Sequence, residues 1–187
     1  MQRPEKVQKA EGKLAVLLPG IGAVSTTLIA GVLLANKGLV KPIGSITQTG
    51  TIRLGKRTDN RVPRIKDFAP LAKMEDIVFG GWDLFPENAH EAAVHAEVLE
   101  SKHLDPVKEE MSAIKPMPAV FYPEFVKRLH GTHIKKGESK WEMVEQLRAD
   151  IRNFIKDNGC SRAVCVWCGS TEVYLEPGPV HQSIAAF

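Results

Sequence analysis

Apolar and polar positions in the first part of the chain predict the elements that organise it. Residues 14–18 read LAVLL, a short continuous run typical of a strand that is covered on both faces. The segment 19–22, PGIG, breaks this run. Residues 24–35 are apolar again and long enough for a helix, which Asn36 and Gly38 end. The pattern predicts a buried strand, a tight glycine turn and a helix.

Two later apolar segments predict further strands. Residues 76–79, DIVF, run into the tetrapeptide 80–83, GGWD, which we expect to form the turn that ends this strand. Residues 162–167, RAVCVW, run into the segment 168–172, CGSTE. Each predicted strand is therefore followed by small residues that permit a turn.

Helical patterns lie between these strands. One covers residues 87–101, a second opens at 105–106 and ends before Pro116, and a third begins at the capping box 139–142 and ends at 158–159. The order of strand, helix, strand, helices and strand is typical of an α/β fold with a parallel sheet. In such sheets the ligand binds at the carboxyl ends of the strands.

The first turn has the residue types of a nucleotide-binding turn. Gly20 and Gly22 would let the backbone approach a pyrophosphate, and the following helix offers free N–H groups and the hydroxyl of Ser25. Ser25 nevertheless takes the place of the usual third glycine, and no acid occurs between Glu11 and Asp59 to hold a ribose. From this motif alone, a cofactor turn and a plain core turn stay equally open. The repeated strand-and-turn order favours the cofactor turn.

Asp83 follows the second predicted strand, where an acid would contact a ribose or a cofactor amide. A second role is to cap the next helix, whose first turn would contain Pro86, and the two roles do not exclude each other.

Segments outside these elements give weaker signals. Residues 39–57 carry β-favouring positions broken by glycines, which predicts short strand pieces and an ordered loop. Residues 53–66 carry six Lys or Arg against Asp59 alone, but no aromatic residue that would stack on bases, so a solvated loop is favoured over nucleic-acid binding. Residues 1–12 are charged and without periodicity, which predicts a flexible lead.

Composition is that of an ordinary globular protein. The 187 residues suffice for one core, and a net charge of +3 does not imply a nucleic-acid partner. Three cysteines form no paired framework, which favours a reducing compartment and a cytoplasmic location. Residues 14–36 are uncharged, but Pro, Gly, Ser and Thr interrupt them, so no membrane span is expected.

Tests for metal and nucleophile sites are negative. His90 and His95 are five residues apart, whereas a zinc-binding helix places its histidines four apart. Cys165 lies inside the third predicted strand and is expected in the core, while Cys168 at its exit would line a ligand site. No metal is expected, and no serine lies in a G-x-S-x-G turn.

Four segments, in this order, resemble the inositol-3-phosphate synthase (myo-inositol-1-phosphate synthase) family in its bacterial form. They read KLAVLLPGIGAVSTTLIAG, GSITQTGTIRLGKR, FGGWD and VWCGSTE. Two shorter pieces, 122–125 (YPEF) and 150–152 (DIR), agree with the same family. The likeness runs from about residue 13 to residue 187. The basic run at 53–66 matches a basic stretch of the family itself, which further weakens the nucleic-acid interpretation.

The resemblance implies a Rossmann-type NAD-binding domain and an enzyme that converts glucose 6-phosphate into inositol phosphate. In this family NAD oxidises the sugar, an enolisation and an aldol closure follow, and the NADH formed reduces the ketone. The family builds the NAD domain from both ends of its chain, around a catalytic and tetramer-forming domain. Residues 13–187 are thus expected to be the N-terminal part of that domain, in a homo-oligomer, with the catalytic domain and catalytic residues absent.

Matched by position, ten residues are implied to bind NAD. They are Gly20, Gly22, Ala23, Val24, Ser25, Asp83, Cys168, Gly169, Ser170 and Thr171. Gly169 stands where the family commonly has alanine. In this family Asp83 would serve the adenosine end, which explains why no acid follows the first predicted strand.

Two other functions stay open at this stage. One is a nucleotide-binding or oligomerisation module without catalysis. The other is a small NAD(P) oxidoreductase, which would need a Tyr/Lys or His/Asp acid–base pair, and no such pair stands out in the sequence.

Overall fold

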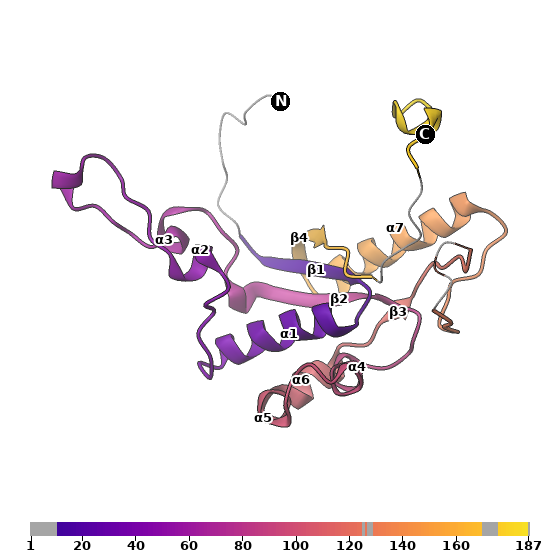
Figure 1. Ribbon diagram of the computed structural model, residues 1–187, viewed down its shortest axis with the longest axis horizontal. Coiled ribbons are helices and arrows are strands. Elements are labelled where there is room, and N and C mark those ends of the chain that lie inside the picture. Colours follow the sequence, from indigo (N-terminus) through magenta and orange to yellow (C-terminus); the bar gives the residue numbers. More distant parts are fainter. Residues whose placement is uncertain (1–10, 125, 127–128, 170–175, 187) are drawn as a thin grey trace.

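The computed structural model describes residues 11–124, 126, 129–169 and 176–186. Most of the predicted lead, residues 1–10, lies outside them. Figure 1 shows the main elements. In chain order they are β1 (Lys13–Pro19), α1 (Ala23–Asn36), α2 (Ile46–Thr49), α3 (Ile65–Phe68), β2 (Ile77–Asp83), α4 (Ala89–Ala96), α5 (Ser101–Leu104), α6 (Lys108–Ala113), β3 (Met117–Pro118), α7 (Lys140–Asp157) and β4 (Cys160–Cys165).

The strands form one parallel sheet in the order β3-β2-β1-β4. The predicted α/β fold with a parallel sheet is therefore confirmed. β1 lies in the centre, as its continuous apolar sequence predicts, and Val16 pairs with Phe79 on one side and with Val164 on the other. In the described part of the chain, no strand pairs with the outer side of β4.

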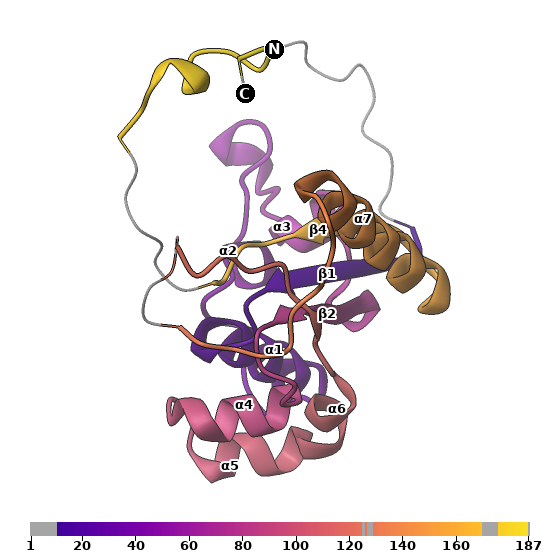
Figure 2. The same ribbon diagram turned by 90° about the vertical axis from the view of Figure 1, so that its right-hand side faces the viewer.

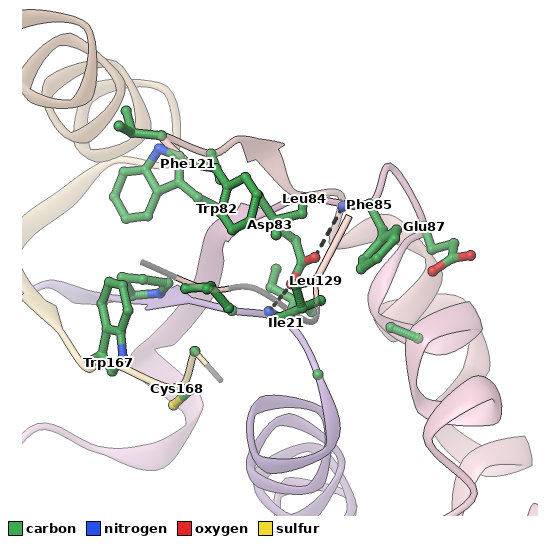
Figure 3. Close-up of a pocket in the computed structure, with 18 of the residues that line it drawn as sticks. Ile21, Trp82, Asp83, Leu84, Phe85, Glu87, Phe121, Leu129, Trp167 and Cys168 are labelled. Atoms are coloured by element: carbon green, nitrogen blue, oxygen red, sulfur yellow. Dashed lines mark hydrogen bonds between the residues drawn. The ribbon is translucent and has the colours of Figure 1, made fainter. Parts of the chain in front are cut away.

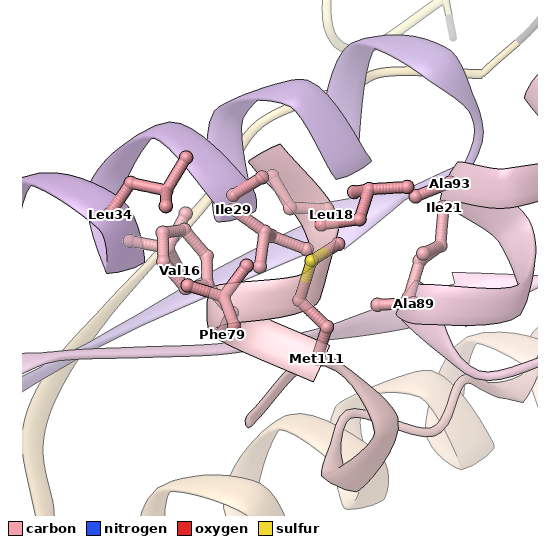
Figure 4. Packing of buried hydrophobic residues seen from close by; sticks show 12 residues of the cluster. Val16, Leu18, Ile21, Ile29, Leu34, Phe79, Ala89, Ala93 and Met111 are labelled. Atoms are coloured by element: carbon pink, nitrogen blue, oxygen red, sulfur yellow. The ribbon is translucent and has the colours of Figure 1, made fainter. Parts of the chain in front are cut away.

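The sheet lies between two layers of helices, with α1 and α4–α6 on one face and α7 on the other (Figure 2). Because side chains alternate along a strand, Val16 and Leu18 face α1, whereas Ala15 and Leu17 face α7. Figure 4 shows the larger cluster, where Met111 of α6 packs with residues of β1, β2 and α1.

Strand β2 includes the two glycines that the sequence predicted to be its terminal turn, so that prediction is wrong. The reason is close packing rather than a turn. A Cβ on Gly81 would collide with the carbonyl oxygen of Leu18 in β1, and a Cβ on Gly80 would collide with the ring of Phe154 in α7. These glycines let the neighbouring strand and the covering helix approach β2.

Two predicted elements have different bounds, and one strand was not predicted. The helix predicted over 87–101 ends at Ala96, because Glu97 adopts the left-handed conformation (φ 53°), and α5 begins only at Ser101. The strand predicted over 162–167 begins two residues earlier and ends at Cys165. β3 was not predicted, because Pro116 and Pro118 were interpreted as helix terminators; Pro118 is tolerated at the edge of a sheet.

Residues 39–71 form an arm that extends from the amino end of the sheet (Figure 1). The arm contains the short helix α2 where strand pieces were predicted, and a second short helix, α3, that was not predicted. Its tip is a hairpin-like loop, closed by hydrogen bonds from Ile52 N–H to Pro63 O (3.0 Å) and from Leu54 N–H to Arg61 O (2.9 Å). The basic residues of the arm therefore lie on an ordered loop far from the carboxyl ends of the strands.

Among the described residues, none of the helices combines the length and the hydrophobicity that a membrane span requires.

The close approach of β1 and β2 predicts a strong effect of one methyl group. Gly81→Ala should lower the free energy of unfolding by more than about 3 kcal/mol, because the new Cβ meets a backbone oxygen that has no room to move. Gly31→Ala is the matched control, since its Cβ meets nothing within 4 Å on α1 and should stabilise the helix by about 0.5–1 kcal/mol. Urea unfolding followed by circular dichroism measures both. Equal stability of Gly81→Ala and the unsubstituted chain would contradict the packing described.

Candidate functional site

The connections of the sheet place a crevice at the carboxyl ends of β1 and β4. The chain leaves β1 towards β2 through α1 on one face, and it reaches β4 from β3 through α7 on the opposite face. At such a switch point the connecting loops diverge and leave room for a ligand. A cavity of about 820 Å³ lies there (Figure 3).

The turn between β1 and α1 forms the floor of this cavity. Gly20 has φ +92°, and a Cβ there would lie 2.7 Å from the Cα of Gly169. Its N–H donates to the carbonyl of Trp82 (2.8 Å), and its own carbonyl accepts from the hydroxyl of Ser25 (2.5 Å). The turn is thereby fixed from three sides, and only glycine fits at position 20.

The N-terminus of α1 opens beside this turn. Gly22 is the N-cap, and among the described residues no side chain caps the helix there. Ala23 and Val24 form the first turn, and Val24 is exposed. The hydroxyl of Ser25, which the sequence suggested as a ligand donor, donates instead to a backbone carbonyl, and so do the hydroxyls of Thr26 and Thr27. The donors that remain at this helix end are backbone N–H groups.

Asp83 ends β2 and links it to the glycine turn. Its Oδ2 accepts the N–H of Ile21 (2.5 Å), and its Oδ1 accepts the N–H of Phe85 (3.1 Å), as the dashed lines in Figure 3 show. The second expected role, as a helix cap, is wrong, because Asn88 caps α4. Asp83 thus occupies the position after the second strand where a dinucleotide fold places its ribose-binding acid.

The segment after β4 closes the other side of the turn. The ladder beside β1 continues beyond Cys165, since Val166 N–H donates to Leu17 O and Cys168 N–H donates to Pro19 O, both at 2.9 Å. Cys168 lines the cavity and packs against the α1 side of the core, as predicted for a residue at the strand's exit. Ser170 and Thr171 lie outside the described residues.

The cavity brings together half of the ten residues that the resemblance implied. Gly20, Gly22, Asp83, Cys168 and Gly169 line it. Of the others that the structure describes, Ser25 is fully buried and supports the turn from within.

Cys165 was expected in the core, and that prediction is wrong. It is exposed, because the end of β4 opens onto the cavity at this level instead of being covered by α7. In the described part of the chain, no group of three or more His, Cys, Asp or Glu side chains is placed to hold a metal ion.

Aromatic and aliphatic residues complete the lining, and the sequence did not single them out. Trp82 lies near the end of β2, and Trp167 lies in the segment that continues β4 beyond Cys165. Phe121 and Tyr122 come from the segment after β3. Helix α7 adds Leu147 and Ile151. The sequence did contain one signal that could have identified the tryptophans: each lies within two residues of a glycine at the end of a predicted strand.

A buried polar network fixes the α7 side of the cavity. Asp150 Oδ2 accepts the indole N–H of Trp82 (2.7 Å) and lies 2.8 Å from the ammonium of Lys135. The Lys135 side chain is 9% exposed and that of Asp150 is 20% exposed, so this pair is largely screened from water. The network joins α7, β2 and the segment that follows β3, and it holds the Trp82 ring against the cavity.

The model of the family described as myo-inositol-1-phosphate synthase, an NAD-binding domain, matches residues 14–187. An inositol-3-phosphate synthase of Bacteroides thetaiotaomicron is 54% identical over 183 residues, which are 97% of this chain and 42% of that protein. One from Oryza sativa is 33% identical over 87% of this chain and 35% of its own length. The chain therefore spans less than half the length of these relatives.

A solved structure agrees with these similarities. The crystal structure of inositol-3-phosphate synthase from Caenorhabditis elegans superposes with a TM-score of 0.76 at 27% identity. The superposition covers 90% of this chain and 36% of that one.

The buried network predicts that Asp150 matters far more than its exposed neighbours on α7. Asp150→Ala should cost about 3 kcal/mol or more in unfolding free energy, because it leaves Lys135 and the Trp82 indole without their common partner. Glu145→Ala, which breaks only the exposed pair with Arg148, should cost less than about 1 kcal/mol. Urea unfolding compares the two variants. A cost for Asp150→Ala no larger than that for Glu145→Ala would refute the role of the network.

Proposed function

The chain belongs to the myo-inositol-1-phosphate synthase family, and we propose that it acts as the N-terminal, NAD-binding part of an inositol-3-phosphate synthase. The observation that carries this proposal is the contact of Gly20 with Gly169 beside the carboxylate of Asp83. It combines a backbone surface for a pyrophosphate with an acid for a ribose.

The residues present fit NAD, the family's cofactor. Glycine at position 20 lets Gly169 pack directly on the turn, and a Cβ on Gly22 would meet nothing within 4 Å, so the backbone at Gly22 is open to a phosphate. The N-terminus of α1 carries no acidic residue in its first turn, so its partial positive charge is available to an anion. The cavity, about 820 Å³, has a volume within the usual range of cofactor sites.

Asp83 would hold the adenosine ribose. A carboxylate has about four lone-pair positions, and the N–H groups of Ile21 and Phe85 occupy one on each oxygen. One further acceptor position stays on each oxygen for the neighbouring hydroxyls of a ribose. The same negative charge would repel the 2′-phosphate of NADP, so the site should select NAD.

Bound NAD supplies a hydride acceptor and, later in the cycle, a hydride donor. This chain's own residues bind and orient it: Gly20 and Gly22 with the backbone N–H groups of α1, Asp83 on the ribose, and Cys168 and Gly169 beside the turn. We place Ala23, Val24, Ser25, Ser170 and Thr171 in the same site by their resemblance to the family.

The substrate we propose is glucose 6-phosphate, as the resemblance implies, and the product is 1D-myo-inositol 3-phosphate. The chemical steps would depend on residues outside this chain, which spans 42% of the Bacteroides relative. We further propose residues 13–187 as one part of the cofactor domain, a homo-oligomeric assembly and a cytoplasmic location, the last supported by three free cysteines.

NAD binding tests the proposed site. Calorimetric titration should show saturable binding of NAD and weaker binding of NADP, and Asp83→Ala should weaken NAD by roughly 10- to 150-fold through the lost hydrogen bonds to a charged group. Asp59→Ala is the matched control, because Asp59 accepts a backbone N–H of Lys56 on the distant arm. Unchanged NAD affinity in Asp83→Ala would remove Asp83 from the site.

Turnover separates the enzyme part from the rival functions. The chain alone should form no inositol phosphate from glucose 6-phosphate and NAD, which phosphorus NMR of the reaction mixture measures. Detectable product would show that the catalytic residues lie within these 187 residues. Reduction of NAD by another alcohol would instead favour a small oxidoreductase.

A further inference from the structure

Trp167 is a large apolar residue that lies open beside the site. The residue is 66% exposed, and it lines the cavity one residue before Cys168. Side chains alternate along the segment that continues β4 beside β1. Cys168 faces the α1 side of the sheet, so Trp167 faces the opposite side, which α7 covers elsewhere. Figure 3 shows it across the cavity from Trp82.

The backbone of the site supports the Trp167 ring. A Cβ on Gly169 would lie 2.9 Å from Cζ2 and 3.1 Å from Cε2 of the indole, so the ring rests against the Cα of Gly169. Gly169 in turn packs on Gly20. The indole therefore lies next to the proposed pyrophosphate turn, and it can pack directly on the backbone there because Gly169 has no side chain.

The order of the strands gives the cofactor a direction. Asp83 at the end of β2 marks the adenosine ribose, and the turn after β1 marks the pyrophosphate. In the order β2-β1-β4, the remaining half of a dinucleotide then extends over the end of β4. Trp167 lies there, at the exit of that strand.

We propose that Trp167 is the stacking platform for the nicotinamide ring of NAD, an assignment that rests on the proposed function. An exposed indole face stacks on flat heteroaromatic rings. The oxidised nicotinamide also carries a positive charge, which the electron-rich face of tryptophan attracts. Trp167 would thus hold the ring at the β4 end, while Asp83 holds the opposite end of the cofactor.

Comparing NAD with ADP-ribose tests this assignment, because ADP-ribose has the adenosine and pyrophosphate parts but no nicotinamide. In calorimetric titrations of the 187-residue chain, Trp167→Ala should weaken NAD by roughly 5- to 150-fold and leave ADP-ribose within about twofold. Trp167→Phe keeps a ring and should restore most of the NAD affinity. Trp141→Ala is the matched control: Trp141 is 68% exposed on α7 and does not line the cavity.

The outcomes distinguish the two proposals. If the unsubstituted chain binds neither NAD nor ADP-ribose, the proposed function fails and the assignment of Trp167 fails with it. If both ligands bind and Trp167→Ala changes neither, or weakens both equally, the proposed function stands and the stacking platform is refuted. Loss of NAD affinity alone, restored by phenylalanine and absent in Trp141→Ala, supports the platform.

Discussion

The structure of this chain depends on backbones that approach each other without side chains between them. Gly20 lies against Gly169, and Gly81 lies against the carbonyl of Leu18, so the central strand contacts both neighbours at its carboxyl end. A methyl group at either contact would separate strands that the hydrogen-bonded ladder holds together. The cavity exists because these strand ends are close while their connections leave in opposite directions. Packing constraint and binding site therefore have the same origin.

Polar groups then fix what the close packing brings together. Asp83 binds the N–H of Ile21 and so ties the end of β2 to the turn after β1. On the other face, Asp150 binds Trp82 and Lys135 and ties α7 to the same strand end. Both carboxylates therefore fix the end of β2: Asp83 binds the turn after β1, and Asp150 binds Trp82 from α7. A ligand at this edge would meet a site whose walls are already positioned, which lowers the entropic cost of binding.

The sequence predicted the central strand, the α1 helix and the long helix α7, because continuous apolar runs and capping residues act locally. It misplaced the turn at Gly80 and Gly81, since a glycine pair looks the same whether it turns the chain or admits a neighbouring strand. It missed β3, because its two residues owe their conformation to pairing with Trp82 and Asp83. It placed Cys165 in the core, because burial at a sheet edge depends on what covers that edge.

Some residues of the candidate site could likewise be predicted from the sequence, and others could not. Gly20, Gly22 and Asp83 were predicted from the sequence because the phosphate and ribose contacts proposed for them need particular residue types at strand ends. The aromatic lining was not, because an indole can serve a core, an interface or a ligand equally well. Position resolves this ambiguity: Trp82 is buried and bound to Asp150, whereas Trp167, with the same side chain, is open and supported by Gly169. Two tryptophans at neighbouring strand ends thus have different physical roles, one in the wall of the site and one available to a ligand.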